Sequence, residues 1–331
     1  MRYIIIGAGA VGGTIGGRLH ESGHEVVLVA RGAHLTALRK EGLRLTTPEG
    51  GRTLPVPAVG GPEELGLRPG DVLVLAVKTQ HSLALLDAWA ARPVAGGGTA
   101  GEVLPLLCAQ NGVENERLAL RRFRHVYGVC VWLPSSHLEP GRVVAQGSPL
   151  SGVLHVGRFP SGSDATAERI AADLAASHFG APVSADVMRW KYAKLLGNLN
   201  NALEAVGGPV DGELRLALAH RTIAEGEAVL TAAGIGFADS DEQRAAGRDL
   251  VTLVPIDGQT RGGGSSWQSL ARGAGDIEAD YLNGEIVLLG RQHGVPTPLN
   301  AALQRLANAF ARDGRAPGSL PEAELAALLE G

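Results

Sequence analysis

The sequence predicts an α/β protein in which an N-terminal Rossmann-type dinucleotide-binding domain is followed by an all-α domain. Over residues 1–184, short apolar runs alternate with helical patterns, which is typical of βαβ units and a mostly parallel sheet. A glycine-rich turn at residues 7–12 follows the first of these runs. From about Val187, β-branched runs become rare and Ala, Leu, Glu and Arg recur at helical spacing. We therefore expect one domain at residues 1–184 and a second at residues 185–331.

Five apolar runs give the expected parallel strands, at residues 3–6, 25–29, 71–77, 103–108 and 125–132. Residues 143–145 and 152–156 are set apart by Gly and Pro and predict a later antiparallel part, which a helix at 165–178 closes. In the second domain, Gly207-Gly208-Pro209 ends one helix and Gly262-Gly263-Gly264 separates two others.

Composition excludes several classes of function. A net charge of −4 and a pI near 6.2 give no basic surface for nucleic acid or an anionic membrane. No run approaches the roughly 18 apolar residues of a transmembrane helix, and the N-terminal apolar run ends at once in glycines, so we expect no export signal. Cys108 and Cys130 lie in apolar runs and are expected to be buried thiols of a cytoplasmic protein. The ten histidines are scattered without a metal-binding pattern, so no metal is expected.

The turn at residues 7–12 has the glycine spacing of a dinucleotide-binding loop. In such loops the first glycine permits a tight turn, the second lets the backbone approach the pyrophosphate, and the third allows close contact between helix and strand. The free N–H groups of the following helix then bind the anion. The residues expected to contact the cofactor are Gly7, Ala8, Gly9, Ala10, Val11 and Gly12.

The end of the second expected strand indicates which cofactor binds. A cofactor with a free ribose 2′-hydroxyl usually meets an Asp or Glu about 20 residues after the glycines. This chain has Ala30 followed by Arg31, whose cation can pair with a 2′-phosphate. The sequence therefore favours NADP(H), and the alternative is that Arg31 is only an exposed arginine at a strand end.

Two polar residues follow neighbouring expected strands. Lys78 comes after the run that begins at Asp71, and Asn111 comes after the run that ends at Cys108. Ligands of open α/β sheets bind outside the carboxyl ends of the strands. We therefore expect Lys78 and Asn111 beside the cofactor, although a solvated lysine and a simple Asn-Gly turn are the alternatives.

A helix expected at residues 188–202 carries a polar stripe. At about 100° per residue, Asn198 lies about 40° from Lys194 and Asn201 about 20° on the other side. Lys191 lies about 60° round, at the edge of the stripe. A lysine with two amides along an otherwise apolar helix can bind a small polar acid. The alternative is that the stripe is the solvent-exposed face of a surface helix.

The stretch Ser265-Ser266-Trp267, then residues 276–284 and Gly294-Val295-Pro296-Thr297-Pro298, resembles the C-terminal signature of ketopantoate reductases (2-dehydropantoate 2-reductases). The resemblance spans Gly7 to Pro298 in the family's order. It implies an active site between the two domains and NADPH-dependent reduction of 2-dehydropantoate to pantoate. It also implies roles for individual residues: Lys194 as proton donor, Glu278 as its catalytic partner, Asn198, Asn201, Ser266 and Asn111 as substrate ligands, and Lys78 and Asn111 at the cofactor–substrate junction.

Three departures from the family pattern concern the substrate pocket. Ala202 stands where a second asparagine is usual and Asn201 comes one residue early, Asp211 replaces a more frequent asparagine, and Trp267 replaces a methionine. These departures leave a reductase for another branched 2-oxo acid or ketone as an alternative. A non-catalytic NADP-binding protein is a second alternative, and a β-hydroxyacid dehydrogenase, which also has a lysine four residues before an asparagine, is a third. The sequence leaves the oligomeric state open, with a homodimer as one alternative.

Overall fold

The structure, a computed structural model, describes residues 1–246, 250–256 and 262–330. The chain forms two compact units. The first comprises Met1–Lys191 and Ala238–Thr260, and the second comprises Tyr192–Phe237 and Arg261–Gly331. The first unit is α/β and the second is helical, which confirms the predicted fold class.

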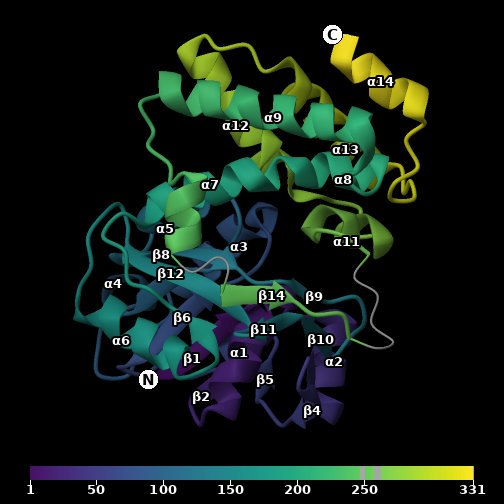
Figure 1. Cartoon of the computed structure of the whole chain (residues 1–331). Coiled ribbons are helices and arrows are strands. Elements are labelled where there is room, and N and C mark those ends of the chain that lie inside the picture. The colour runs from purple at the N-terminus through teal and green to yellow at the C-terminus, as the bar shows by residue number, and fades with distance from the viewer. Residues whose placement is uncertain (247–249, 257–261, 331) are drawn as a thin grey trace. The chain divides into compact units, whose positions relative to one another are not determined.

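The described part of the first unit contains a main sheet of eight strands (Figure 1). In spatial order they are β13 (Phe179–Gly180), β12 (Gly152–Arg158), β8 (His125–Trp132), β7 (Pro105–Cys108), β6 (Asp71–Leu75), β1 (Arg2–Ile6), β2 (Glu25–Val29) and β5 (Ala58–Val59). Neighbouring strands are parallel except for β12 and β8, which pair antiparallel. All five predicted parallel strands are present, and the antiparallel strand at residues 152–156 is confirmed as part of β12.

Helices cover both faces of this sheet. Tyr3 and Ile5 of β1 belong to one apolar core, while Ile4 and Ile6 belong to a second, because successive side chains of a strand point to opposite faces. The helices of this unit are α1 (Ala10–Glu21), α2 (Gly32–Glu41), α3 (Ser82–Ala90), α4 (Ala100–Val103), α5 (Asn115–Leu120), α6 (Ala165–Ala175) and α10 (Ser240–Ala245), with the short 3-10 helices η1 (Pro62–Glu64) and η2 (Thr79–His81).

Two smaller sheets complete the first unit. The hairpin of β3 (Leu43–Thr47) and β4 (Gly50–Leu54) was not predicted, and β10 (Arg142–Ala145) pairs parallel with β3 and antiparallel with β9 (Ser135–Ser136). Residues 143–145, which were expected in the antiparallel part, therefore belong to this second sheet and have one parallel and one antiparallel neighbour. The third sheet pairs β11 (Gly147–Pro149) with β14 (Val251–Leu253).

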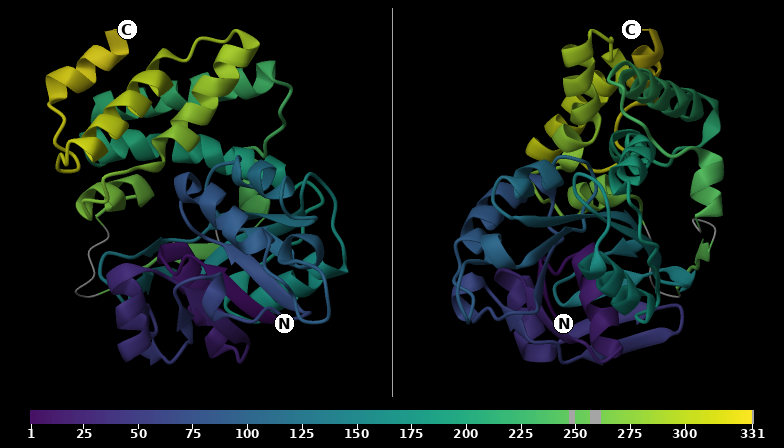
Figure 2. Two further views of the ribbon diagram at one scale, coloured as in Figure 1. Left: turned by 180° about the vertical axis from the view of Figure 1, so that it is seen from behind. Right: turned by 90° about the vertical axis from the view of Figure 1, so that its left-hand side faces the viewer.

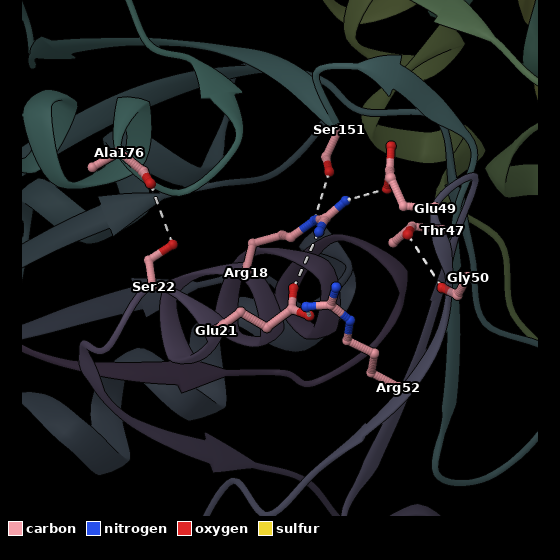
Figure 3. Close-up of polar contacts among 9 residues, drawn as sticks. All are labelled: Arg18, Glu21, Ser22, Thr47, Glu49, Gly50, Arg52, Ser151 and Ala176. Carbon is pink, nitrogen blue, oxygen red and sulfur yellow. Dashed lines mark hydrogen bonds and ion pairs between the residues drawn. The ribbon is translucent and has the colours of Figure 1, made fainter.

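The guanidinium of Arg18 ties α1 to the β3–β4 hairpin (Figure 3). It donates hydrogen bonds to Ser151 Oγ at 2.9 Å, and to Glu21 and Glu49 at 3.1 Å each. Glu49 lies in the turn of the hairpin. Because Arg18 is buried, its charge needs these partners, and the contacts fix the helix that follows the glycine loop against the second sheet.

The second unit is built around the long helix α9 (Gly212–Ala232). This helix packs against α8 (Asn200–Gly207), α12 (Asn283–His293), α13 (Pro298–Arg312) and α14 (Glu322–Glu330) (Figure 2). The unit also contains α11 (Ser265–Ala271) and the 3-10 helix η4 (Glu278–Tyr281). Leu203, Leu218, Leu303 and Phe310 are fully buried in its core. No helix among the described residues is long and apolar enough to cross a membrane.

The chain passes from the first unit to the second within α7 (Val187–Asn198). The sequence predicted one change of domain after residue 184, whereas residues 238–260 return to the first unit. The cause is long-range pairing, because β14 joins β11 and Glu242 forms an ion pair with Arg189 at 2.5 Å. The predicted single helix at 188–202 is also divided, and α8 begins at Asn200 after an interruption at Leu199.

A buried histidine packs against the start of α7. The ring of His155 on β12 stacks on Trp190, with centroids 4.4 Å apart. Burial lowers the pKa of His155 from 6.5 to about 4. Neither ring nitrogen has a hydrogen-bond partner among the residues that the structure describes. The folded protein therefore favours the neutral form of the His155 imidazole.

We expect His155 to make the protein less stable in acid. As the pH falls from 6.5 to about 4, the unfolded chain takes up a proton that the folded chain does not. At about 1.4 kcal/mol per pKa unit, folding stability should fall by about 3 kcal/mol over this window. His155→Phe keeps the ring stack without the titration, so urea unfolding at both ends of the window should show a smaller loss for the variant. Equal losses in the two proteins would contradict this assignment.

Candidate active site

The glycine loop connects β1 to α1 at the carboxyl edge of the main sheet. The backbone N–H groups of Gly7 and Ala8 donate to the carbonyl of Val29 at 3.1 and 3.2 Å, which joins the loop to the end of β2. Gly7 has φ +104°, and a Cβ placed there would lie 2.6 Å from Val77 Cγ1. Only glycine therefore fits at this turn.

Gly12 and Gly9 are needed for different reasons. A Cβ on Gly12 would lie 2.0 Å from the carbonyl oxygen of Gly7, whereas a Cβ on Gly9 would meet nothing within 4 Å. Gly12 is thus required by close packing of helix on strand, while Gly9 leaves an open approach to the start of α1. No side chain caps this end of the helix, and no acidic residue lies in its first turn. These features fit the pyrophosphate of a dinucleotide.

His34 on α2 holds the glycine loop in place and was not identified from the sequence. Its Nδ1 accepts a hydrogen bond from the backbone N–H of Gly141 at 2.9 Å, so Nε2 carries the proton and donates to Ala8 O at 2.8 Å. Burial lowers the pKa of His34, which favours this neutral form. Nothing in the local sequence pattern indicated a contact between these three segments.

Arg31 lies immediately before α2, at its N-cap position. The side chain is exposed, and within the described part of the chain it forms no ion pair. Gly32 and Ala33 in the first turn of α2 are exposed as well. The guanidinium is therefore available to an anionic ligand, as the assignment to a 2′-phosphate requires.

The structure brings Lys78 and Asn111 to the same sheet edge as the glycine loop. Strands β1, β6 and β7 are parallel neighbours, so the turns that follow them lie side by side. Lys78 immediately precedes η2, and Asn111 lies in the turn between β7 and α5. Both positions are at the carboxyl ends of the strands, where ligands of open α/β sheets bind.

The remaining predicted site residues belong to the second unit. Lys194 and Asn198 are four residues apart on α7 and share a face, while Asn201 lies on α8 beyond the interruption at Leu199. Lys194 is half-buried. Asn198 is only 5% exposed, and its Nδ2 has no hydrogen-bond partner among the described residues. An unsatisfied buried donor of this kind is costly unless a water or a ligand pairs with it.

Asn201 lies close to the helix that carries Ser266. A Cβ placed on Gly264, the residue before α11, would be 3.1 Å from Asn201 Oδ1, and the Gly264 N–H donates to Glu204 at 2.8 Å. Ser266 is buried in the first turn of α11. Glu204 was not identified from the sequence, because only the packing of α8 against α11 reveals it.

Glu278, the last of the predicted site residues, also lies in the second unit. Glu278 is the first residue of η4 and is buried, and η4 packs against α12 and α13.

Within the described ranges, no group of three or more His, Cys, Asp or Glu side chains is placed to hold a metal ion. Cys108 and Cys130 are both buried free thiols.

Comparison with known proteins accounts for nearly the whole chain. The family description "Ketopantoate reductase PanE/ApbA" matches residues 3–161, and its C-terminal counterpart matches residues 186–311. A 2-dehydropantoate 2-reductase from Mesorhizobium japonicum is 30% identical over 342 residues, which is 94% of this chain and 98% of that protein.

Solved structures agree with this match. The PanE/ApbA family ketopantoate reductase from Ralstonia eutropha JMP134 is 30% identical, has a TM-score of 0.77, and the match covers 95% of this chain and 100% of that one. A D-mandelate dehydrogenase solved with NADH and anilino(oxo)acetate has a TM-score of 0.79 over 96% of this chain and 100% of that one, and at 23% identity it shows the fold alone. The chain therefore belongs to the ketopantoate reductase PanE/ApbA family.

Proposed function

We propose that this protein reduces 2-dehydropantoate to pantoate with NADPH. The proposal rests on the resemblance of the sequence around Lys194, Asn198, Ser266 and Glu278 to the family's motifs. The fit of residues 7–12 to a dinucleotide supports the cofactor part of the proposal. Identification of pantoate as the product, by mass spectrometry after incubation with NADPH and 2-dehydropantoate, tests it.

Each residue of the second unit has a chemical role in this proposal. When bound, a reduced nicotinamide supplies the hydride that C2 of the substrate accepts. The Lys194 ammonium stabilises the developing alkoxide and transfers a proton to that oxygen, which yields a 2-hydroxy acid. The carboxylate of Glu278 holds this ammonium in place and accepts a hydrogen bond from the new hydroxyl.

The other polar residues hold the substrate. The Ser266 hydroxyl donates to the substrate carboxylate. The Asn198 Nδ2 supplies a buried donor for a substrate oxygen, which would satisfy its missing hydrogen bond. Asn201 contributes a second amide near the start of α11. Lys78 and Asn111 lie where the cofactor and substrate meet in this proposal.

Preference for NADPH rests on Arg31. Arg31→Ala should weaken NADPH binding by about 1–3 kcal/mol, because it removes a charge-assisted contact to the 2′-phosphate. NADH lacks that phosphate, so its affinity should hardly change. Fluorescence titration of both cofactors measures the difference. Arg52→Ala is the matched control, since Arg52 is also an exposed arginine of the first unit and pairs with Glu21. Equal losses for NADPH and NADH would refute the assignment of Arg31.

A second candidate is a reductase for another branched 2-oxo acid or ketone. Ala202 is buried in the apolar core of the second unit, so the usual second asparagine has no direct replacement there. The ring of Trp267 lies against Gly262 and Gly263, where added Cβ atoms would fall 1.9 and 2.6 Å from it. The same fold also occurs in a D-mandelate dehydrogenase solved with NADH and anilino(oxo)acetate. A non-catalytic NADP-binding protein is disfavoured because the reactive residues are all present.

Location and assembly remain predictions. A cytoplasmic enzyme with buried thiols suits the composition. A homodimer is the assembly that we would test first, by light scattering of the purified protein.

A further inference from the structure

A buried ion pair joins the first half of α7 to the turn that contains Asn111. Lys191 is 3% exposed and Glu116 is completely buried. The Lys191 ammonium donates to Glu116 Oε1 and, at 3.1 Å, to the backbone carbonyl of Gln110. Lys191 therefore bonds directly to the residue before Asn111.

A chain of buried hydrogen bonds continues from this turn to the one that carries Lys78. The Gln110 side-chain amide donates to Val77 O at 2.7 Å and to Ser82 Oγ at 2.9 Å. Ser82 donates to Asn115 Oδ1 at 2.7 Å, and Asn115 Nδ2 donates to Thr79 Oγ1 at 2.9 Å. The residues on either side of Lys78 are thus held by the same network that Lys191 joins.

Glycines in the sheet make room for the start of α7 beside this network. Gly128 on β8 and Gly157 on β12 are direct partners in the antiparallel ladder. A Cβ on Gly128 would lie 2.9 Å from Val187 Cγ1, and a Cβ on Gly157 would lie 2.1 Å from Ser184 O. Larger residues at these two positions would push the first turn of α7, and Lys191 with it, away from Glu116.

A contribution to folding stability does not by itself explain why Lys191 and Glu116 are paired in the interior. Taking both charges out of water is costly, and apolar replacement of a whole buried pair is often neutral or stabilising. Burial raises the pKa of Glu116, although Lys191 acts in the opposite direction, as expected for a charge removed from water. A pair retained at this cost is better explained by the geometry that it imposes.

We propose that Lys191 and Glu116 are positioning residues for the reductase reaction. They fix the Gln110–Asn111 backbone and, through the Gln110 side chain, the turn that carries Lys78. They touch neither substrate nor cofactor in this role and act through Asn111 and Lys78. The inference rests on the proposed function, in which those two residues meet the cofactor and substrate.

The test compares Lys191→Met, Glu116→Leu and the double variant with the wild-type protein. Each single variant leaves one charged group of the pair buried without its partner, so each should lower Tm. The double variant removes both charges and should regain most of the lost Tm. Its kcat/KM for the 2-oxo acid should nevertheless stay about 10- to 100-fold below wild type, the expected cost of a small misplacement of reacting groups. A purely structural pair would recover both quantities together.

A readout that does not depend on activity is hydrogen–deuterium exchange. Amides of residues 76–82 and 109–115 should exchange faster in the double variant than in the wild type, because the Gln110 carbonyl loses its bond to Lys191 and the network loses its link to α7. The matched control is Arg2→Met with Asp71→Asn. That pair lies 2.6 Å apart, also involves a fully buried carboxylate, and sits at the amino end of β6, away from Lys78. The control should change Tm but leave both kcat/KM and exchange in these two segments unchanged.

Recovery of wild-type kcat/KM in the double variant, with unchanged exchange in both segments, would overturn the proposal. If the wild-type protein reduces no 2-oxo acid, the proposed function fails instead. The exchange measurement then still decides whether the pair orders the two turns.

Discussion

Replacing Lys194 with alanine is expected to lower kcat by about 10²–10⁴-fold, the usual contribution of a positioned general acid. Without the ammonium, the developing alkoxide loses the cation and the proton donor that the proposal assigns to it. NADPH affinity should change little, because Lys194 is not among the proposed cofactor contacts, which are the glycine loop, Arg31, Lys78 and Asn111. Steady-state kinetics for kcat and fluorescence titration for the NADPH Kd measure the two quantities separately.

The structure changes the choice of control for this experiment. Lys191 is buried and paired with Glu116, so Lys191→Ala should also lower stability and is not a neutral comparison. Lys40→Ala makes the same chemical change at a side chain that is 78% exposed on α2, and should leave kcat unaltered. A greater loss of kcat in folded Lys191→Ala than in Lys194→Ala would mean that the wrong lysine has been assigned.

The ratio of kcat/KM for ketopantoate over 2-oxoisovalerate is expected to reach about 10⁴ or more, the limit for a site that hydrogen-bonds a substrate hydroxyl. 2-Oxoisovalerate lacks the hydroxymethyl group of ketopantoate, and with it the 4-hydroxyl that the site would hydrogen-bond. An apolar pocket would discriminate by only about 10–200-fold. Ala202 lies in the apolar core and cannot hydrogen-bond this hydroxyl. In the proposal, that hydrogen bond therefore comes from Asn201, which lies beside the start of α11.

The same ratio tests the role of Asn201. Asn201→Ala should reduce the ratio to the range of an apolar pocket, since the amide that replaces the family's usual asparagine is lost. Asn308→Ala is a matched control, because Asn308 bonds Asp280 at the surface of the same unit. A ratio near unity in the wild-type protein would favour the second candidate, a reductase for another 2-oxo acid.

Local sequence patterns were sufficient for the parts of the fold that depend on neighbouring residues. The expected strand at residues 25–29 matches β2, and the run at 125–132 matches β8, because each is a continuous apolar segment bounded by turns. The sequence predicted a tight turn at Gly7 and close helix–strand contact at Gly12. The structure shows a positive φ at Gly7 and no room for a Cβ at Gly12.

Contacts between distant segments could not be predicted in this way. Lys191 and Glu116 are 75 residues apart, and the sequence placed Lys191 only at the edge of a helical stripe. His34 bridges Ala8 and Gly141, and β14 returns to β11, although no periodicity links these positions. The polar stripe on α7 and α8 was predicted from one continuous helix, whereas the interruption at Leu199 places Asn201 on a separate helix. Pairing between distant segments determines the contacts of Lys191, His34 and β14.

The most direct test of the central claim is NADPH oxidation by the purified protein against a panel of 2-oxo acids that includes ketopantoate, 2-oxoisovalerate and a phenyl-substituted acid. We predict turnover of ketopantoate with the highest kcat/KM of the panel, formation of pantoate in equal amount to NADP produced, and loss of this turnover in Lys194→Ala. Absence of NADPH oxidation with every member of the panel, in protein that is folded and binds NADPH, would contradict the account.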